Sequence, residues 1–138
     1  TFGSDTAAAN TLHDYEEGDW TPTMNSSGTW DITDAHYVKI GSLVQCWAVC
    51  TNIEESGTQT ADLIISGLPY TVEFQTVGGN LMMYGVGTNA NNLNVWVKTD
   101  ETLRIYETIN GSAWDALEWE DITDDDKIYF EFCYRTTQ

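Results

Sequence analysis

The sequence Tyr37-Val-Lys-Ile-Gly-Ser-Leu-Val-Gln-Cys-Trp-Ala-Val-Cys50 holds two β-rich runs separated by Gly41-Ser42. Glycine at the first of two turn positions is typical of a type II′ turn, which joins antiparallel strands into a hairpin. The stretch therefore predicts a two-residue hairpin, and it makes an all-β, antiparallel fold the working hypothesis for the chain.

The pattern on both sides of this hairpin is also β, from Trp20 onward. Turn signals at Gly67, Pro69 and Asn110-Gly111 separate short apolar or alternating runs. The further strands we expect cover residues 60–66, 81–86, 93–98, 102–108 and 128–134. Short strands with turn residues between them indicate one β-sandwich or barrel domain.

Period-two alternation assigns the side chains of each strand to two faces. Charged residues mark the outward side, because an unpaired buried charge is costly. The residues expected inside are Val44, Cys46, Ala48, Cys50, Leu93, Val95, Val97, Leu103, Ile105, Ile128, Phe130, Phe132 and Tyr134.

The same assignment leaves Trp47, Trp96, Tyr106 and Tyr129 on outward faces. Two interpretations stay open. A neighbouring subunit covers them, since aromatic side chains are enriched in interface cores, or their flat rings stack on sugars.

Twenty-two acidic and five basic residues give the 138-residue chain a net charge of −17. This charge disfavours nucleic-acid partners and anionic membrane surfaces. No run reaches the roughly 18 apolar residues that cross a bilayer, so we expect no membrane insertion. Adaptation to a saline habitat and simple solubility both explain the acidity. The chain begins at Thr1 rather than Met, and we expect it to be part of a longer polypeptide.

The cysteines predict neither a disulfide nor a redox site. Cys46 and Cys50 lie four apart in an expected strand, so their Cα atoms are roughly 13 Å apart, whereas a disulfide needs less than about 7 Å. We expect inert free thiols. The sequence also lacks a nucleophile elbow, a phosphate loop and a dinucleotide fingerprint, so we expect no catalysis.

Carboxylates are too abundant here for any pair to indicate chemistry, and we interpret Glu16-Glu17 as a solvated turn. One acidic run precedes the last strand and could hold Ca²⁺, which prefers six to eight oxygen ligands, although the EF-hand pattern is missing. The candidate ligands are Asp121, Asp124, Asp125 and Asp126. His13 and His36 are too few and too far apart to predict a metal site. We expect no other cofactor.

Four motifs in order along the chain resemble the C-terminal receptor-binding or tip module of tail-fibre and tailspike proteins of tailed viruses. They are Asn10-Thr-Leu-His-Asp-Tyr-Glu-Glu-Gly-Asp-Trp-Thr-Pro22, Tyr37-Val-Lys-Ile-Gly-Ser-Leu-Val44, Ser66-Gly-Leu-Pro-Tyr70 and Asp121-Ile-Thr-Asp-Asp-Asp-Lys-Ile-Tyr-Phe130. The chain departs from the family pattern at Ala35-His36 and Val38. Residues 71–118, where a specificity region would vary, carry no recognisable motif.

The resemblance implies a jelly-roll-like antiparallel β-sandwich, with residues 1–14 as a connector from an upstream fibre shaft and 15–138 as the tip domain. It implies a homotrimer about the fibre axis, located in the virion at the tip of the tail fibre. The module would attach the virion to a host-surface glycan or envelope component without cleaving it. Three copies would supply avidity, so each site could be weak.

Two groups of side chains follow from these arguments. The candidate ligand-binding residues are Trp96, Tyr106, Trp114, Trp119, Asn91, Asn92 and Asn94. The candidate architectural or interface residues are Trp20, Pro22, Tyr37, Ile40, Trp47 and Tyr129. Three alternatives remain: a trimerisation or capping module of the fibre without a receptor site, a carbohydrate-binding module of a secreted protein, and a hydrolase.

Overall fold

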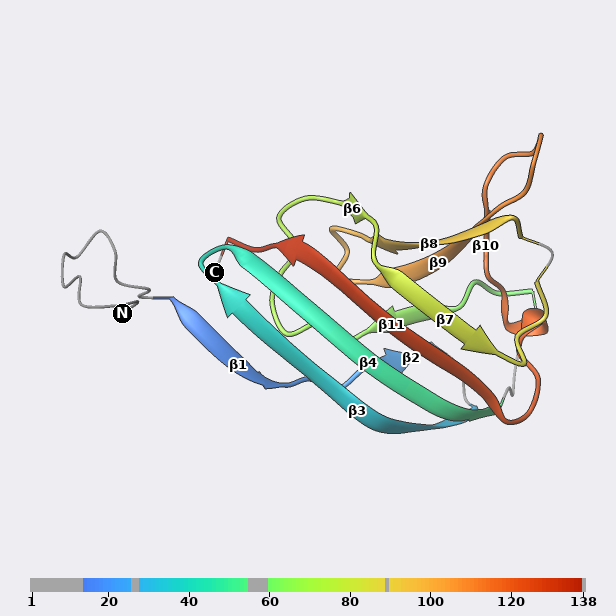
Figure 1. Ribbon diagram of the computed structural model, residues 1–138, viewed down its shortest axis with the longest axis horizontal. Coiled ribbons are helices and arrows are strands. Elements are labelled where there is room, and N and C mark those ends of the chain that lie inside the picture. Colours follow the sequence, from blue (N-terminus) through green and yellow to red (C-terminus); the bar gives the residue numbers. More distant parts are fainter. Residues whose placement is uncertain (1–13, 26–27, 55–59, 89, 138) are drawn as a thin grey trace.

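The computed structural model describes residues 14–25, 28–54, 60–88 and 90–137, and they form a sandwich of two antiparallel sheets (Figure 1). The first sheet has the order β1 (Tyr15–Asp19), β3 (Thr29–Ile40), β4 (Leu43–Glu54), β11 (Asp126–Arg135) and β7 (Asn80–Tyr84). The second has the order β2 (Thr23–Met24), β5 (Ile64–Ser66), β9 (Leu103–Thr108), β8 (Asn92–Val97) and β6 (Thr76–Val77), with β10 (Asp115–Ala116) also paired to β9.

The chain crosses repeatedly between the sheets, as in jelly-roll domains. The predicted all-β sandwich is therefore confirmed. One helical turn, the 3₁₀ helix η2 (Trp119–Asp121), precedes the last strand. The described residues contain no helix that is long and apolar enough to span a membrane.

The predicted hairpin joins β3 to β4, and Ile40 lies opposite Leu43 across a two-residue turn. Gly41 has a φ of +59°, whereas Ser42 is not among the residues with positive φ. A positive φ at the first turn position alone is the geometry of a type II′ turn, which glycine adopts at little cost. Both strands are 12 residues long, so β3 begins well before the predicted Tyr37.

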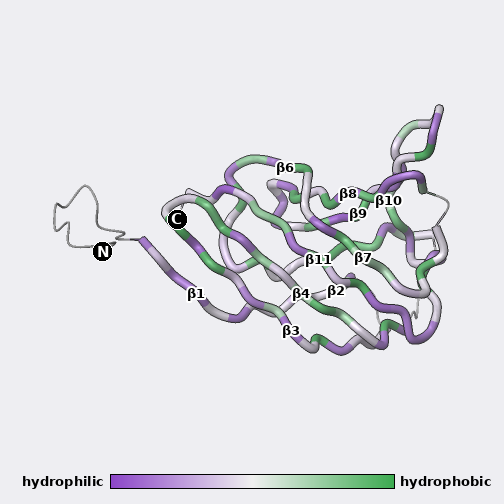
Figure 2. Tube along the Cα trace, in the orientation of Figure 1, coloured by the Kyte–Doolittle hydropathy of each residue, from purple (hydrophilic) through white to green (hydrophobic). Residues whose placement is uncertain are grey.

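The inner faces of the two sheets pack together into one apolar core. Val44, Cys46, Ala48 and Cys50 of β4 are at most 2% exposed, as alternation predicts. The inward residues of β9 and β11 are also buried, and in Figure 2 hydrophobic and hydrophilic positions alternate along the strands. Burial raises the pKa of Cys46 and of Cys50 to about 12, which keeps both as thiols at neutral pH.

The prediction that Glu16-Glu17 forms a solvated turn is wrong, because both residues lie in strand β1. The five residues of β1 pair with residues 36–40 of β3. Glu16 lies opposite Lys39, whose side chain is only 2% exposed. The Lys39 Nζ lies 2.6 Å from an oxygen of Asp14 and 3.3 Å from one of Glu16. A buried lysine requires such partners, and this requirement explains why an acidic segment pairs here as a strand.

The ring of Tyr70, from the segment between β5 and β6, completes this polar cluster. The Tyr70 hydroxyl donates to Glu16 at 2.7 Å, and its ring lies 5.5 Å from Lys39 Nζ. The hydrogen bonds from Tyr70 and Lys39 lower the pKa of the Glu16 carboxyl. We call Asp14, Glu16, Lys39 and Tyr70 the β1 lock. Residues 1–13, most of the predicted connector, lie outside the described residues.

The predicted strand over residues 60–66 is shorter in the structure, where β5 covers only Ile64–Ser66. The preceding residues hydrogen-bond to the segment around η2 instead. The Leu63 amide donates to the Leu117 carbonyl, and the Trp119 amide donates to the Ala61 carbonyl. This pairing holds η2 against the sandwich.

Candidate functional site

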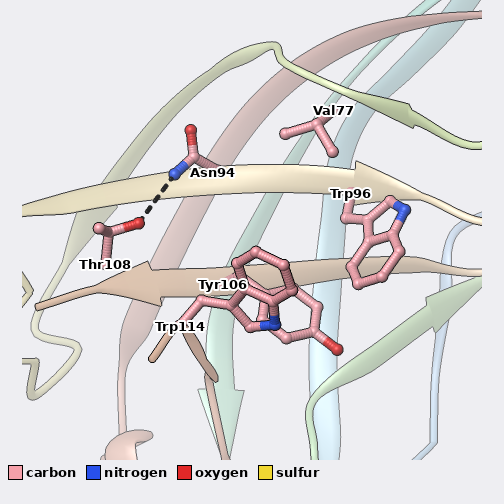
Figure 3. A pocket seen from close by; sticks show the side chains of 6 residues that line it. All are labelled: Val77, Asn94, Trp96, Tyr106, Thr108 and Trp114. Atoms are coloured by element: carbon pink, nitrogen blue, oxygen red, sulfur yellow. Dashed lines mark hydrogen bonds between the residues drawn. The ribbon is translucent and has the colours of Figure 1, made fainter. Parts of the chain in front are cut away.

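The outer face of the second sheet carries a groove of about 250 Å³. Residues from β6, β8, β9 and the segment before β10 line it, as Figure 3 shows. They are Val77, Asn94, Trp96, Tyr106, Thr108 and Trp114. We call this feature the aromatic groove.

Strand register brings these side chains together. Asn94 lies opposite Tyr106 in the β8–β9 pair, and Val77 lies opposite Trp96 in the β6–β8 pair. Residues directly opposite each other in antiparallel strands point to the same side of a sheet. The rings of Trp96 and Tyr106 are 5.2 Å apart at an angle of 53°. Trp114 is 70% exposed, so its ring is open to a ligand.

The polar part of the groove consists of an amide and a hydroxyl. The Asn94 Nδ2 donates to the Thr108 Oγ1 at 3.4 Å, and the Asn92 Nδ2 donates to the Asn94 Oδ1 at 3.4 Å. Asn94 retains a second amide hydrogen, and the Thr108 hydroxyl can also donate. Both groups can therefore hydrogen-bond a ligand without losing the contacts that orient them.

No carboxylate or cation lines the groove among the described residues. Lys98 and Arg104 lie beside it, and each has an acidic partner. Arg104 lies 2.9 Å from Asp62, and Lys98 lies 3.7 Å from Asp100. A hydrogen bond from Thr102, together with these cations, lowers the pKa of Asp100 and keeps it ionised.

Four of the seven candidate ligand-binding residues line the groove, and they are Trp96, Tyr106, Trp114 and Asn94. A fifth, Asn92, lies beside it and hydrogen-bonds Asn94. Asn91 has a different role. Its side-chain oxygen accepts from the Asn110 amide at 2.6 Å, which holds the start of β8 to the end of β9.

The prediction that Trp119 contacts a ligand is wrong, because this residue is only 2% exposed and belongs to the core. Helix η2 turns the indole inward, where Nε1 donates to the Asn25 Oδ1 at 3.1 Å. Of its two acidic neighbours, Glu120 is exposed and Glu118 is half-buried, whereas the tryptophan between them is buried.

Two lining residues, Val77 and Thr108, were not among the candidates. Thr108 could have been found, since it shares the outward side of β9 with Tyr106 by period-two alternation. Val77 had no such signal. Strand β6 has two residues, too few to show any alternation.

The outer face of the first sheet also exposes large apolar side chains, and charged residues such as Glu131 and Arg135 lie among them. We call it the flat face. Its exposed large hydrophobic side chains, placed on this face by the strand registers, are Tyr15, Ile40, Leu43, Met82 and Tyr84. Trp47 and Tyr129 lie among them half-buried.

The other candidate architectural residues divide between core and surface. Trp20 and Pro22 are buried, and the Trp20 indole meets Phe130 and Phe132 edge-on at 6.3 and 5.9 Å. Tyr37 is half-buried against Tyr70. Ile40 is 46% exposed on the flat face, so it has no core role within a single chain.

Two of the four candidate calcium ligands, Asp121 and Asp126, accept hydrogen bonds within turns, and Asp124 and Asp125 are exposed. Asp126 is 2% exposed and accepts from the amide and the hydroxyl of Thr123 at 2.7 and 3.1 Å. Asp121 accepts from the Glu118 amide at 3.0 Å. Within the described ranges, no three His, Cys, Asp or Glu side chains converge as a metal site would require.

No family model, curated protein or solved structure matches this sequence.

Proposed function

We propose that this chain is a non-catalytic glycan-binding domain, the distal domain of a viral tail fibre that attaches the virion to a host-surface glycan or envelope component. The aromatic groove carries the proposal. Flat rings beside a fixed amide and hydroxyl suit a pyranose, which has an apolar face of C–H bonds and a rim of hydroxyls. In this proposal the protein forms a homotrimer on an upstream shaft, at the tail-fibre tip of the virion.

The position of the groove supports the role of a tip. Strand β1 starts at one end of the sandwich (Figure 1). The loop between β9 and β10, which leads to Trp114, protrudes at the opposite end. A shaft joined to β1 would therefore leave this loop pointing away from the particle.

The experiment is a glycan array probed with the labelled protein, followed by titration of each bound oligosaccharide. Trp114→Ala should weaken binding about tenfold or more, because it removes a stacking ring and its buried area. Tyr84→Ala is the matched control, since Tyr84 is a similarly exposed ring (68%) on the flat face. Equal affinity of the Trp114→Ala variant and the parent for every glycan that binds would overturn the proposal.

The flat face favours a second candidate function, a trimerisation or capping module without a receptor site. Large exposed apolar patches on a sheet mark interaction surfaces, and neighbouring copies would cover this one. A protein that assembles but binds no host glycan, and whose Trp114→Ala variant still supports adsorption, would favour this candidate. A carbohydrate-binding module of a secreted protein would use the same groove as a monomer, so the solution mass distinguishes it.

A further inference from the structure

The two ends of the aromatic groove differ in chemistry, as Figure 3 shows. Asn94 and Thr108 lie at one end and are hydrogen-bonded to each other. Val77 and Trp96 lie at the other end, and Val77 is 67% exposed. Tyr106 and Trp114 lie along the side between them. A ligand that fills the groove therefore meets hydrogen-bonding groups at one end and exposed methyl groups at the other.

Charge limits the ligand further. The chain carries a net charge of −17, so an anion approaching any part of it meets a repulsive field. The two cations beside the groove do not reverse this field locally. Asp62 and Asp100 neutralise Arg104, Asp100 also lies near Lys98, and Lys98 stands over the Trp96 ring at 5.4 Å.

Arg104 has one donor without a partner, its Nε, but this atom is shielded from solvent. An anion in the groove could not reach it without displacing the side chains that cover it. The groove thus offers an anion no accessible unpaired cation among the described residues, and a cation finds no carboxylate in the lining. A neutral ligand fits this lining best.

We propose that the aromatic groove binds a neutral pyranose that carries a methyl group, either the methyl of a 6-deoxy sugar or that of an acetamido group. The inference rests on the proposed glycan-binding function and specifies its ligand class. The C–H face of the sugar stacks on Trp114 and Tyr106, its oxygen atoms accept from Asn94 and Thr108, and its methyl group packs against Val77 and Trp96.

Both sources of the methyl group share this chemistry, and matched sugars separate them. The probes are 6-deoxy, 6-hydroxy and 6-carboxylate hexoses, with the 2-acetamido-6-hydroxy sugar, each in the gluco, galacto and manno configurations. Displaying each sugar at high density on a surface raises weak single-site binding to a measurable level.

The 6-deoxy or the acetamido sugar should bind about fourfold more tightly than its 6-hydroxy counterpart, the effect of burying one methyl group. The carboxylate sugar should bind more weakly than both. Val77→Thr keeps the shape of the side chain but replaces a methyl group with a hydroxyl, so it should abolish the preference for the methyl-bearing sugar. Val38→Thr, on the outward side of β3, is the matched control and should preserve it.

Failure of this inference can be distinguished from failure of the proposed function. Suppose the carboxylate sugar binds best, or the methyl-bearing sugar has no advantage, and Trp114→Ala still abolishes binding. The groove is then a glycan site, and the ligand class is wrong. If Trp114→Ala changes no binding in any configuration, both proposals are overturned.

Discussion

The flat face and the aromatic groove are two outer surfaces of the same sandwich that expose aromatic side chains, and they differ in shape and in the strands that form them. The flat face lies on a sheet with two 12-residue strands and one of ten. The groove lies on a sheet in which no described strand exceeds six residues. The first sheet carries an open depression of about 280 Å³ between β4, β11 and β7, whereas the short strands and protruding loop of the second sheet enclose the groove more closely.

This difference teaches that aromatic exposure alone does not identify a binding site. Tyr84 on the flat face and Trp114 in the groove are almost equally exposed, at 68% and 70%. Trp114 differs in its neighbours, because a second ring and an oriented amide lie beside it in one concave surface. The flat face suits a broad protein partner, and the groove suits a small ligand.

The largest effect we expect separates two tryptophans that are five positions apart. Trp119→Ala should lower the free energy of unfolding by about 3–5 kcal/mol, because it empties a core position. Trp114→Ala should change it by no more than about 0.5 kcal/mol, as is usual at exposed positions. Urea denaturation of both variants measures the difference. Similar losses would mean that Trp114 stabilises the fold as a core residue does, and that its ring is not free to bind a ligand.

The next effect tests whether the flat face is the one that other copies cover. Replacing both Met82 and Tyr84 with serine should shift the solution mass toward the monomer, since each side chain contributes about 1.5–3 kcal/mol when fully buried. Trp114→Ser, made as a control, should leave the mass unchanged. Light scattering on a sizing column measures both.

Chemical labelling of Cys133 gives an independent test of whether the flat face is covered. This cysteine is exposed and lies on the outward side of β11, whereas Cys46 and Cys50 are buried. In the folded monomer a thiol reagent should therefore label Cys133 and spare the other two. Equal labelling of Cys133 in the monomer and in the assembled protein would show that the flat face stays uncovered.

A smaller effect concerns the β1 lock at the edge of the flat face. The folded state lowers the pKa of Glu16 from its ordinary value of 4.5, so the unfolded chain binds its proton more readily. The stability that Glu16 contributes is thus present above about pH 4.5 and lost as the pH falls through the lower folded value. The melting temperature of the parent should exceed that of Glu16→Gln at pH 6, and the gap should close in acid. A difference in melting temperature that stays constant with pH would contradict the lowered pKa of Glu16 in the folded state.

The smallest effect comes from the overall charge. Salt screens repulsion among the acidic side chains, so raising it from low to molar concentration should increase the melting temperature by about 2–4 °C, as about 1 kcal/mol would. Binding of a neutral sugar to the groove should not change over the same range, because no charge lines it. Thermal melts and titrations at both salt concentrations compare the two responses.

The residues whose role depends on local pattern were predicted from the sequence. Gly41-Ser42 gave the hairpin, and alternation gave the buried sides of β4 and β11, because turn geometry and period two are properties of neighbouring residues. The rings of Trp96 and Tyr106 were placed outward for the same reason. The acidic strand β1 was missed because the reason for its pairing, the buried Lys39, lies more than 20 residues away.

The rest of the site depends on contacts that no local pattern encodes. Trp119 was predicted to contact a ligand, and only the pairing of residues 61–63 with 117–119 places it in the core. Val77 enters the groove because β6 joins β8 at a two-residue ladder. In both cases the contact joins two segments that are distant in sequence, and neither segment has a pattern that predicts the other as its partner.

The β1 lock has a mechanical consequence if a force is applied to the start of β1. A pull on β1 toward its start acts along the strand axis, so it loads all five residue pairs with β3 in shear at once instead of peeling them apart singly. A force applied there first reaches Asp14 and Glu16, and both residues form ion pairs with Lys39. The first strand of the sandwich is therefore arranged so that its five pairs with β3 would have to break together before it detaches.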